Sequence, residues 1–346
     1  MQGVDNLTLS RVSKKLKIGI TYDLRDDYLK EGYNLEETAE FDLLDTIEAI
    51  EKVFLDNGFQ ADRIGNVKAL TRRLAAENRW DLVFNIAEGL YGFGREAQIP
   101  ALLDAYNIPY TFSDPLGHTL SLHKGMTKHV LRDLGIPTPD FAVVNSDAEI
   151  DNVNLPFPLF AKPVAEGTSK GITALSKITN REELRRTCKH ILQTFKQPAL
   201  IETYLPGREF TVGILGTGKD AKVLGVIEVI LKPTAEQNAY SYENKEHYEN
   251  LVQYALVDDD EAKQARKIAL KVWRNLDLKD AGRVDLRSDA HGAPHFMEVN
   301  SLAGLNPKRS DLPILCNLLG MSYHVLISSI IESALRRADI NLKILH

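Results

Sequence analysis

Two carboxylates and an amide near the end of the chain have the spacing of a divalent-metal site. Arg283, Asp285 and Arg287 alternate along one predicted strand. Glu298 and Asn300 alternate along the next. Side chains two positions apart share a face of a strand, so a hairpin would bring Asp285, Glu298 and Asn300 together. Mg²⁺ prefers such oxygens, and two ions could neutralise charge in phosphate transfer; an exposed hairpin with solvated charges is the alternative.

Two lysines occupy positions that a phosphate group would explain. Lys162 ends the apolar stretch Leu159-Phe160-Ala161, and burying an ammonium without a partner is costly. Lys124 begins a predicted helix, where a basic residue opposes the helix dipole and does not stabilise the helix. Lys162 is therefore predicted to contact a phosphate, whereas for Lys124 an ordinary surface lysine at a helix start is the alternative.

A loop with small residues follows Lys162. The segment 166–172 carries Glu166, Thr168, Ser169 and two glycines. Glycine lets the backbone approach a polyphosphate closely, and successive N–H groups can hold it. The spacing is neither that of a Walker loop nor that of the dinucleotide fingerprint.

A strand end further along could bind a nucleoside. Ala199 to Glu202 is a predicted strand, followed by Thr203, Tyr204 and Leu205. A connection between two lobes could supply backbone groups to an adenine edge, with Tyr204 and Leu205 beside the ring and Glu209 near the ribose. An ordinary hairpin is the alternative.

The elements that position these residues alternate between strand and helix at first. Strands are predicted at 16–21, 81–85 and 108–111, and a helix runs from Leu43 to Phe54 and is closed by Asn57-Gly58. Such alternation predicts a parallel sheet covered on both faces. Ligands sit beyond the carboxyl ends of parallel strands, so the loop 85–94 faces a predicted site.

Later segments predict two further units. Helices are expected at 124–134, 181–195, 261–276 and 322–338, and strands at 141–144, 159–162, 199–202, 210–215, 282–286 and 295–299, with more strand from 223 to 240. The polar, tyrosine-rich loop at 240–250 is predicted to be a lid. The fold class is α/β (α+β).

Composition excludes several classes of function. Hydrophobic residues at 44% and charged residues at 26% are ordinary for a globular protein. A net charge of −6 argues against broad nucleic-acid binding. No apolar run approaches the ~20 residues that span a bilayer, and the first residues have no apolar core of signal-peptide length. A cytoplasmic protein without membrane partners is expected, with Cys188 and Cys316 as reduced thiols.

The motifs together resemble the ATP-grasp superfamily and, within it, the D-alanine–D-alanine ligase family. The resemblance rests on 122–124, 160–163, 166–169, 202–211, 283–285 and 298–304, and it extends from about residue 17 to 335. It implies an N-terminal Rossmann-like substrate domain at 17–120 after a polar tail at 1–16. Two ATP-grasp lobes would follow, at 121–205 and 206–346.

The resemblance also implies roles for individual residues. Lys124 and Lys162 would contact the phosphates of ATP, and Asp285, Glu298 and Asn300 would ligate two Mg²⁺ ions, with Mn²⁺ as an alternative metal. The remaining ATP-binding residues would be Glu166, Thr168, Ser169, Glu202, Tyr204, Leu205 and Glu209. Arg283 and the amide of Gly304 would stabilise the acyl phosphate and the tetrahedral intermediate. Lys245 matches the lid lysine that approaches the γ-phosphate.

The sequence departs from the family pattern mainly at the positions that would recognise the substrates. Glu246 follows the lid lysine, where the family has an aromatic residue, and Glu88 stands where the family has a histidine. Glu40 and Glu37 both fit the glutamate that anchors the first substrate's ammonium. Ser310 is placed near the second substrate's carboxylate. The extra acids Glu88 and Glu246 would favour a substrate with an additional cationic group.

The resemblance therefore implies an ATP-dependent ligase that joins two small amino acids through an acyl phosphate, with the D-alanine pair as the named expectation. The first alternative is a sister ligase for another amine, basic or from secondary metabolism. The second alternative is a non-catalytic ATP-binding module. A homodimer is the expected assembly.

Overall fold

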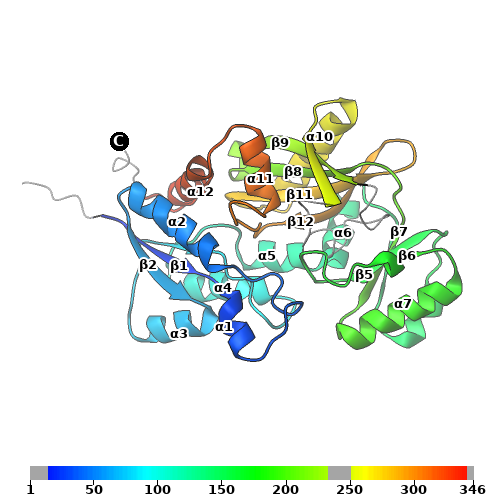
Figure 1. Cartoon of the computed structure of the whole chain (residues 1–346), viewed down its shortest axis with the longest axis horizontal. Coiled ribbons are helices and arrows are strands. Elements are labelled where there is room, and N and C mark those ends of the chain that lie inside the picture. Colours follow the sequence, from blue (N-terminus) through cyan, green and yellow to red (C-terminus); the bar gives the residue numbers. More distant parts are fainter. Residues whose placement is uncertain (1–14, 233–250, 341–346) are drawn as a thin grey trace, which may run out of the picture.

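The computed structural model describes residues 15–232 and 251–340, which form three sheets flanked by helices (Figure 1). The first sheet is parallel, with β1 (Lys17–Thr21) between β2 (Gln60–Gly65) and β3 (Leu82–Asn85). Its central strand buries Ile18 and Ile20 completely. Predicted strands 16–21 and 81–85 are confirmed. β2 was not expected, because this edge strand has few apolar residues.

Helices cover both faces of this sheet. α2 (Leu44–Asp56) packs on the face that carries Ile18 and Ile20, while α3 (Val67–Ala75) and α4 (Gln98–Ala105) pack on the other. Gly58 has φ +77°, which confirms the predicted left-handed end of α2. The short α1 (Arg25–Lys30) follows β1.

The prediction of a third strand for this sheet, at 108–111, is wrong. The segment makes one isolated parallel bridge, between Tyr110 and Val83, instead of a ladder. Phe112 then takes a positive φ and its N–H donates to Asp280, which turns the chain away from the sheet.

The second sheet is antiparallel, in the order β4-β7-β5-β6. Two helices lead into it, α5 (Pro115–Leu122) and α6 (Lys124–Asp133). Its strands are β4 (Phe141–Val144), β5 (Leu159–Pro163), β6 (Lys177–Ile178) and β7 (Ala199–Thr203). α7 (Arg181–Thr194) packs on one face through Leu184, Cys188 and Ile191.

The third sheet is antiparallel and has the order β10-β9-β8-β11-β12. The strands are β8 (Glu209–Leu215), β9 (Lys222–Leu231), β10 (Val252–Leu256), β11 (Ala281–Ser288) and β12 (Pro294–Asn300). α10 (Asp260–Asn275) covers one face, with Trp273 fully buried, and α11 (Asp311–Leu318) contacts β8 and β9. The predicted strand from 223 is confirmed as far as Leu231.

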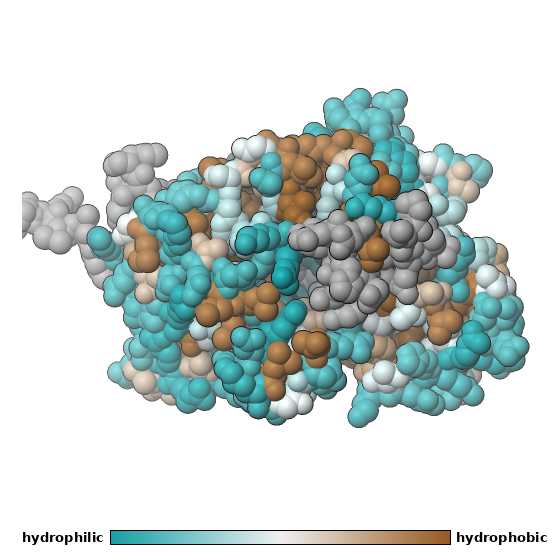
Figure 2. Space-filling view, viewed as in Figure 1, coloured by the Kyte–Doolittle hydropathy of each residue, from teal (hydrophilic) through white to brown (hydrophobic). Residues whose placement is uncertain are grey.

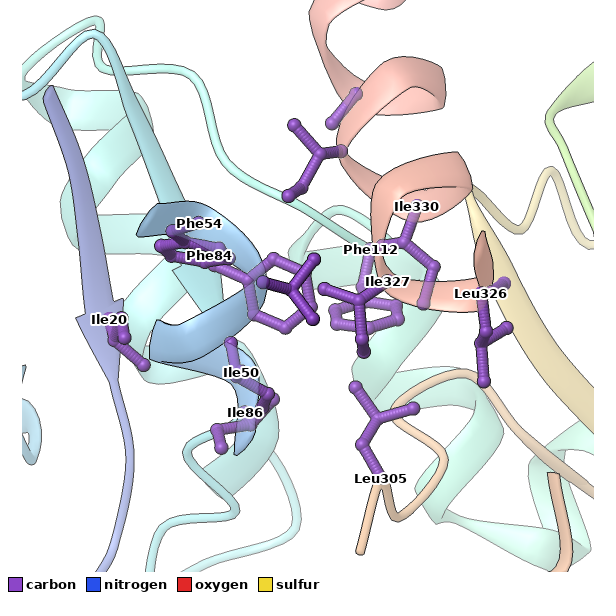
Figure 3. Close-up of a cluster of buried hydrophobic side chains, with 14 of the residues drawn as sticks. Ile20, Ile50, Phe54, Phe84, Ile86, Phe112, Leu305, Leu326, Ile327 and Ile330 are labelled. Carbon is purple, nitrogen blue, oxygen red and sulfur yellow. The ribbon is translucent and has the colours of Figure 1, made fainter. Parts of the chain in front are cut away.

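The last helix joins the C-terminal part of the chain to the first sheet. α12 (Tyr323–Arg337) packs against α2. Figure 3 shows Leu326, Ile327 and Ile330 facing Phe54 and Phe84 in one apolar core. This core, built from segments nearly 300 residues apart, fixes how the first and third sheets meet.

The described surface is mixed in character. Figure 2 shows hydrophilic side chains over α2 and α7 and a hydrophobic patch beside α11. Within the described residues no single helix is long and apolar enough to cross a membrane. α11 and α12 reach that length and composition only as a pair, and they are bent by 115°. Cys188 and Cys316 are both free and buried.

Candidate active site

The predicted pairing of Asp285 with Glu298 is present. β11 and β12 run antiparallel, with Asp285 opposite Glu298 and Arg283 opposite Asn300. The Asp285 carboxylate accepts hydrogen bonds from the Thr211 hydroxyl at 2.7 Å and from the Asn300 amide at 3.1 Å. The hairpin therefore brings together the three side chains that the sequence singled out.

Two pockets meet at this hairpin. The large pocket, of about 360 Å³, is lined by Glu298, Asn300, Arg283 and residues of the first sheet's loops. The small pocket, of about 80 Å³, is lined by Asp285, Glu298 and residues of the second sheet. Glu298 and Asp311 border both pockets, so a group held by the hairpin can reach ligands on either side.

Lys124 stands at the large pocket beside the hairpin. It begins α6, where the His123 side chain caps the helix by accepting from Met126 N–H. Its ammonium donates to the Glu166 carbonyl at 2.6 Å and lies 3.4 Å from the Glu298 carboxylate. The lysine is only 6% exposed, so its charge is directed at the site.

Lys162 lines the small pocket and is tied to a buried ionic cluster. Glu202, which is fully buried, pairs with Lys162 at 3.0 Å and with Lys128 at 2.6 Å. Burial would raise the pKa of Glu202, but the two ammonium groups outweigh burial and the pKa is lowered. Burial lowers the pKa of Lys128 to about 8 against the opposing effect of Glu202. Glu202 thus lies behind Lys162 and does not line the small pocket.

The loop after β5 separates the two pockets. Thr168 lines the large pocket and Ser169 the small one, and both have positive φ. The Gly167 N–H donates to Glu40 at 2.6 Å, and a Cβ at Gly167 would lie 2.3 Å from that carboxylate. Glycine is required there by close approach. Glu166 is held by Lys170 and Gln197 and lines neither pocket.

The predicted nucleoside residues converge on the small pocket. Tyr204, Leu205 and Glu209 all line it. Glu209 pairs with Arg287 at 3.3 Å. The ammonium of Lys177 lies 4.3 Å from the centroid of the Tyr204 ring. Phe160, Ile172 and Met297 provide apolar lining beside these groups, which suits a flat aromatic ligand.

Arg283, Gly304 and Ser310 line the large pocket together. Arg283 pairs with Asp311, a short contact, and its Nε lies 3.5 Å from Asp285. The Ser310 hydroxyl accepts from Asn306 N–H at 3.0 Å. A Cβ at Gly304 would lie 2.8 Å from that hydroxyl. Asp311 was not expected from the sequence, because its pairing with Arg283 spans two elements.

Of the two possible anchoring glutamates, Glu40 reaches the large pocket and Glu37 is exposed. One guanidinium nitrogen of Arg95 donates to both Glu40 oxygens at 3.0 Å. Arg95 also donates to the Ala165 carbonyl at 2.9 Å and is 6% exposed. The sequence analysis did not predict a role for Arg95. The signal that could have indicated one is the Arg95-Glu96 pair just before the apolar helix α4.

Three acidic groups of the large pocket have raised pKa values. Burial and then neighbouring Glu96 raise the pKa of Glu88 well above its usual range. Burial raises the pKa of Glu96 to about 7, although Arg95 opposes the shift. Burial, helped by Asp23, raises the pKa of Asp42 to about 8. A buried group whose charged form is disfavoured is typical of binding and catalytic sites.

The donor set at the hairpin fits magnesium. Asp285 and Glu298 offer carboxylates and Asn300 an amide oxygen, the hard ligands that Mg²⁺ takes. Within the described part of the chain no three His, Cys, Asp or Glu side chains converge as a metal cluster. A metal here would therefore be completed by phosphate oxygens and water. Lys245, Glu246 and the lid loop 240–250 lie outside the described residues.

Comparison with known proteins gives consistent matches. The family model described as D-ala D-ala ligase C-terminus matches residues 130–332. A D-alanine–D-alanine ligase of Aquifex aeolicus is 32% identical over 83% of this chain and 94% of its own. An uncharacterised protein of Sinorhizobium fredii is 35% identical over 74% of this chain and 75% of its own. The fold resembles the ATP complex of the Bacillus anthracis D-alanine–D-alanine ligase, with a TM-score of 0.70 and 22% identity over 94% and 99% of the two chains.

Proposed function

The chain belongs to the D-alanine–D-alanine ligase family, and on that premise we propose that it uses ATP to join two small amino acids by an amide bond. The D-alanine pair is the named expectation, since the curated relative of Aquifex aeolicus carries that activity in its name. The proposal rests on one observation above all. The hairpin sets Asp285 opposite Glu298 at the junction of two pockets.

The two pockets would bind different substrates of the reaction. ATP would lie with its nucleoside in the small pocket, beside Tyr204, Leu205 and Glu209, and with its phosphates between Lys162 and Lys124. The amino acids would lie in the large pocket. Asp285, Glu298 and Asn300 would hold two Mg²⁺ ions, or Mn²⁺, which supply charge neutralisation to the phosphates when bound.

The chemistry follows from these placements. A carboxylate oxygen of the first amino acid attacks the γ-phosphorus, the bond to the bridging oxygen breaks, and ADP leaves. The neutral amine of the second amino acid then attacks the acyl carbon, and inorganic phosphate leaves as the amine loses its proton. Arg283 and the Gly304 N–H would stabilise the oxyanion that forms between these events. Exclusion of water protects the acyl phosphate from hydrolysis.

A screen tests the proposed function directly. The full chain is incubated with Mg²⁺, ATP and pairs of amino acids of both configurations, and ADP and the mass of each product are measured. ADP together with a dipeptide is expected for at least one pair. ADP release without any amide product, or no dependence of ADP release on amino acids, would contradict the proposal.

Arg283→Ala is expected to lower kcat by about 100- to 1000-fold, because its guanidinium stabilises charge that forms only during the reaction. The Kd of ATP is expected to change less than threefold. Steady-state kinetics and calorimetric ATP binding check the two quantities. Because the change leaves Asp311 without its guanidinium, Arg283→Lys serves as the folding control. Equal losses in ATP affinity and kcat would assign Arg283 to nucleotide binding instead.

We further propose a cytoplasmic homodimer with no nucleic-acid or membrane partner. The chain would be organised into a substrate domain at 17–120 and ATP-grasp lobes at 121–205 and 206–346. Sedimentation equilibrium tests the oligomeric state, and a monomer at micromolar concentration would reject the dimer.

A further inference from the structure

The large pocket contains an acidic subsite, formed by Glu88, Glu96 and Ser121, that the proposed reaction does not use. All three residues line the pocket. Glu96 is 8% exposed, and the Ser121 hydroxyl is buried without a hydrogen-bond partner, its residue being 4% exposed. Within residues 15–232 and 251–340, no hydrogen bond reaches either carboxylate. The nearest ring nitrogen to Glu96 belongs to His118, at 3.8 Å.

His118 cannot serve as the missing cation. Its side chain is fully buried and its Nδ1 lies 3.0 Å from the Ser301 hydroxyl. Burial lowers the pKa of His118 to about 4, so the ring is neutral at physiological pH. The acidic subsite therefore has hydrogen-bond acceptors and no counter-charge in contact.

The other carboxylates of the large pocket each have a basic neighbour. Glu298 lies 3.4 Å from Lys124, Asp311 pairs with Arg283, and Glu40 pairs with Arg95. Asp42 has no ion pair within the described part of the chain, but it accepts from the Thr46 hydroxyl and has Arg25 at longer range. Among the described residues Glu88 and Glu96 have no ion pair with a Lys or Arg side chain; they share Arg95 at longer range with Glu40, and Lys124 also acts on Glu96 at longer range.

Glu40 is already neutralised before any substrate arrives. The Arg95 guanidinium contacts both of its oxygens, and the Gly167 N–H takes one of them as well. A cationic group entering the large pocket would thus find stronger attraction at Glu88 and Glu96. Burial raises the pKa of both carboxyl groups, and a bound ammonium would favour their charged forms, which gives the subsite a preference for positive charge.

We propose that the acidic subsite of Glu88, Glu96 and Ser121 binds a second, side-chain ammonium group of an amino-acid substrate, so that the preferred substrate class is a short diamino acid. The inference rests on the proposed function, because that function places amino acids in the large pocket. The two carboxylates accept from the ammonium, and the Ser121 hydroxyl supplies a third acceptor.

An isosteric pair of ligands tests the subsite. 2,4-Diaminobutyrate and norvaline differ only by an ammonium in place of a terminal methyl group. Each enantiomer is titrated into the full chain by calorimetry, with Mg²⁺ and a non-hydrolysable ATP analogue present. One enantiomer of diaminobutyrate is expected to bind at least roughly tenfold more tightly than the matching norvaline, as one charged hydrogen bond would provide.

Glu88→Gln keeps the size of the side chain and removes its ability to carry a negative charge. It is expected to weaken diaminobutyrate binding more than norvaline binding, so that the preference falls to less than threefold, and Glu96→Gln is expected to act in the same direction. Glu182→Gln, an exposed glutamate on α7, is the matched control. Melting temperatures verify folding, and replacing a buried carboxyl group that has no ion pair by a neutral amide should not lower them. Absence of binding, equal binding of both ligands by the unmodified chain, or equal loss for both in Glu88→Gln would overturn the proposal.

The same samples separate this inference from the ligase proposal. Selective binding of diaminobutyrate without any ADP or dipeptide would uphold the subsite and reject the ligase. ADP and a dipeptide formed from alanine, with no preference for diaminobutyrate in binding, would uphold the ligase and reject the subsite.

Discussion

Replacing Asp285 with asparagine is expected to abolish turnover, lowering kcat by about 1000-fold or more, because metal-assisted charge neutralisation contributes several kcal/mol to phosphoryl transfer. The neutral amide is a far weaker Mg²⁺ ligand than the carboxylate. It retains one oxygen that can still accept from the Thr211 hydroxyl, which lies 2.7 Å from Asp285. The chain should therefore stay folded, and coupled detection of ADP measures the loss.

The same hairpin offers a matched control. Asp289 lies in the turn between β11 and β12, accepts from the N–H groups of His291 and Ala293, and lines neither pocket. Asp289→Asn should retain at least half of the activity. Unchanged turnover in Asp285→Asn would remove the metal role from the account, and a lowered melting temperature would show that the loss came from folding.

Glu202→Gln is expected to lower the free energy of unfolding by about 3–5 kcal/mol, the usual cost of leaving a buried charge without its partner. The substitution is isosteric and creates no cavity. It leaves the ammonium groups of Lys128 and Lys162 close together without the carboxylate that contacts both of them in the native protein. ATP affinity should fall as well, because Lys162 would lose the anchor that orients it at the small pocket. Urea unfolding measures the stability.

A second change identifies the cause. Lys128→Met in the Glu202→Gln background removes one of the two uncompensated charges and should restore part of the lost stability. Asp151→Ala, which breaks the exposed pair with Arg185 at 2.8 Å, is expected to leave the free energy of unfolding almost unchanged, because solvent screens the pair. A loss for Glu202→Gln no larger than that for Asp151→Ala would show that the buried cluster does not stabilise the fold.

The hairpin of β11 and β12 could be predicted from the sequence because strand geometry fixes it. Period-two alternation placed Asp285 and Glu298 on matching faces, and the observed register sets them opposite each other. Two other elements could be predicted equally well from local pattern. The helix α6 begins at Lys124 and the buried strand β5 ends at Lys162–Pro163, and each combines an apolar pattern with a lysine at one end.

Other parts depend on contacts between distant segments and have no local signal. The segment 108–111 has the composition of a strand, but the hydrogen bond of Phe112 to Asp280 redirects it. Arg95 meets Glu40 across 55 positions, and Asp311 meets Arg283 between a helix and a strand. Glu202 carried a strand-end signal, yet its two lysine partners are brought to it by tertiary packing alone.

The residues expected to determine substrate specificity were also only partly predictable from local sequence pattern. Glu88 stood out in the sequence because it replaces the histidine of the family, but Glu96 and Ser121 join it only in the folded chain. The pairing of Glu40 with Arg95 makes Glu88 more important for binding a cationic substrate, because Arg95 already neutralises the Glu40 carboxylate. Specificity is thus expected to follow charge balance across the whole large pocket.

Transfer of ¹⁸O from carboxylate to phosphate would show whether the protein uses ATP to activate the carboxylate. The amino acid that gives the fastest ADP release is labelled with ¹⁸O in its carboxylate and incubated with the full chain, Mg²⁺, ATP and the accepting amine. Activation of the carboxylate by ATP predicts one ¹⁸O in inorganic phosphate for each amide bond formed. Amide formation with unlabelled phosphate, or with AMP and pyrophosphate as products, would contradict the account.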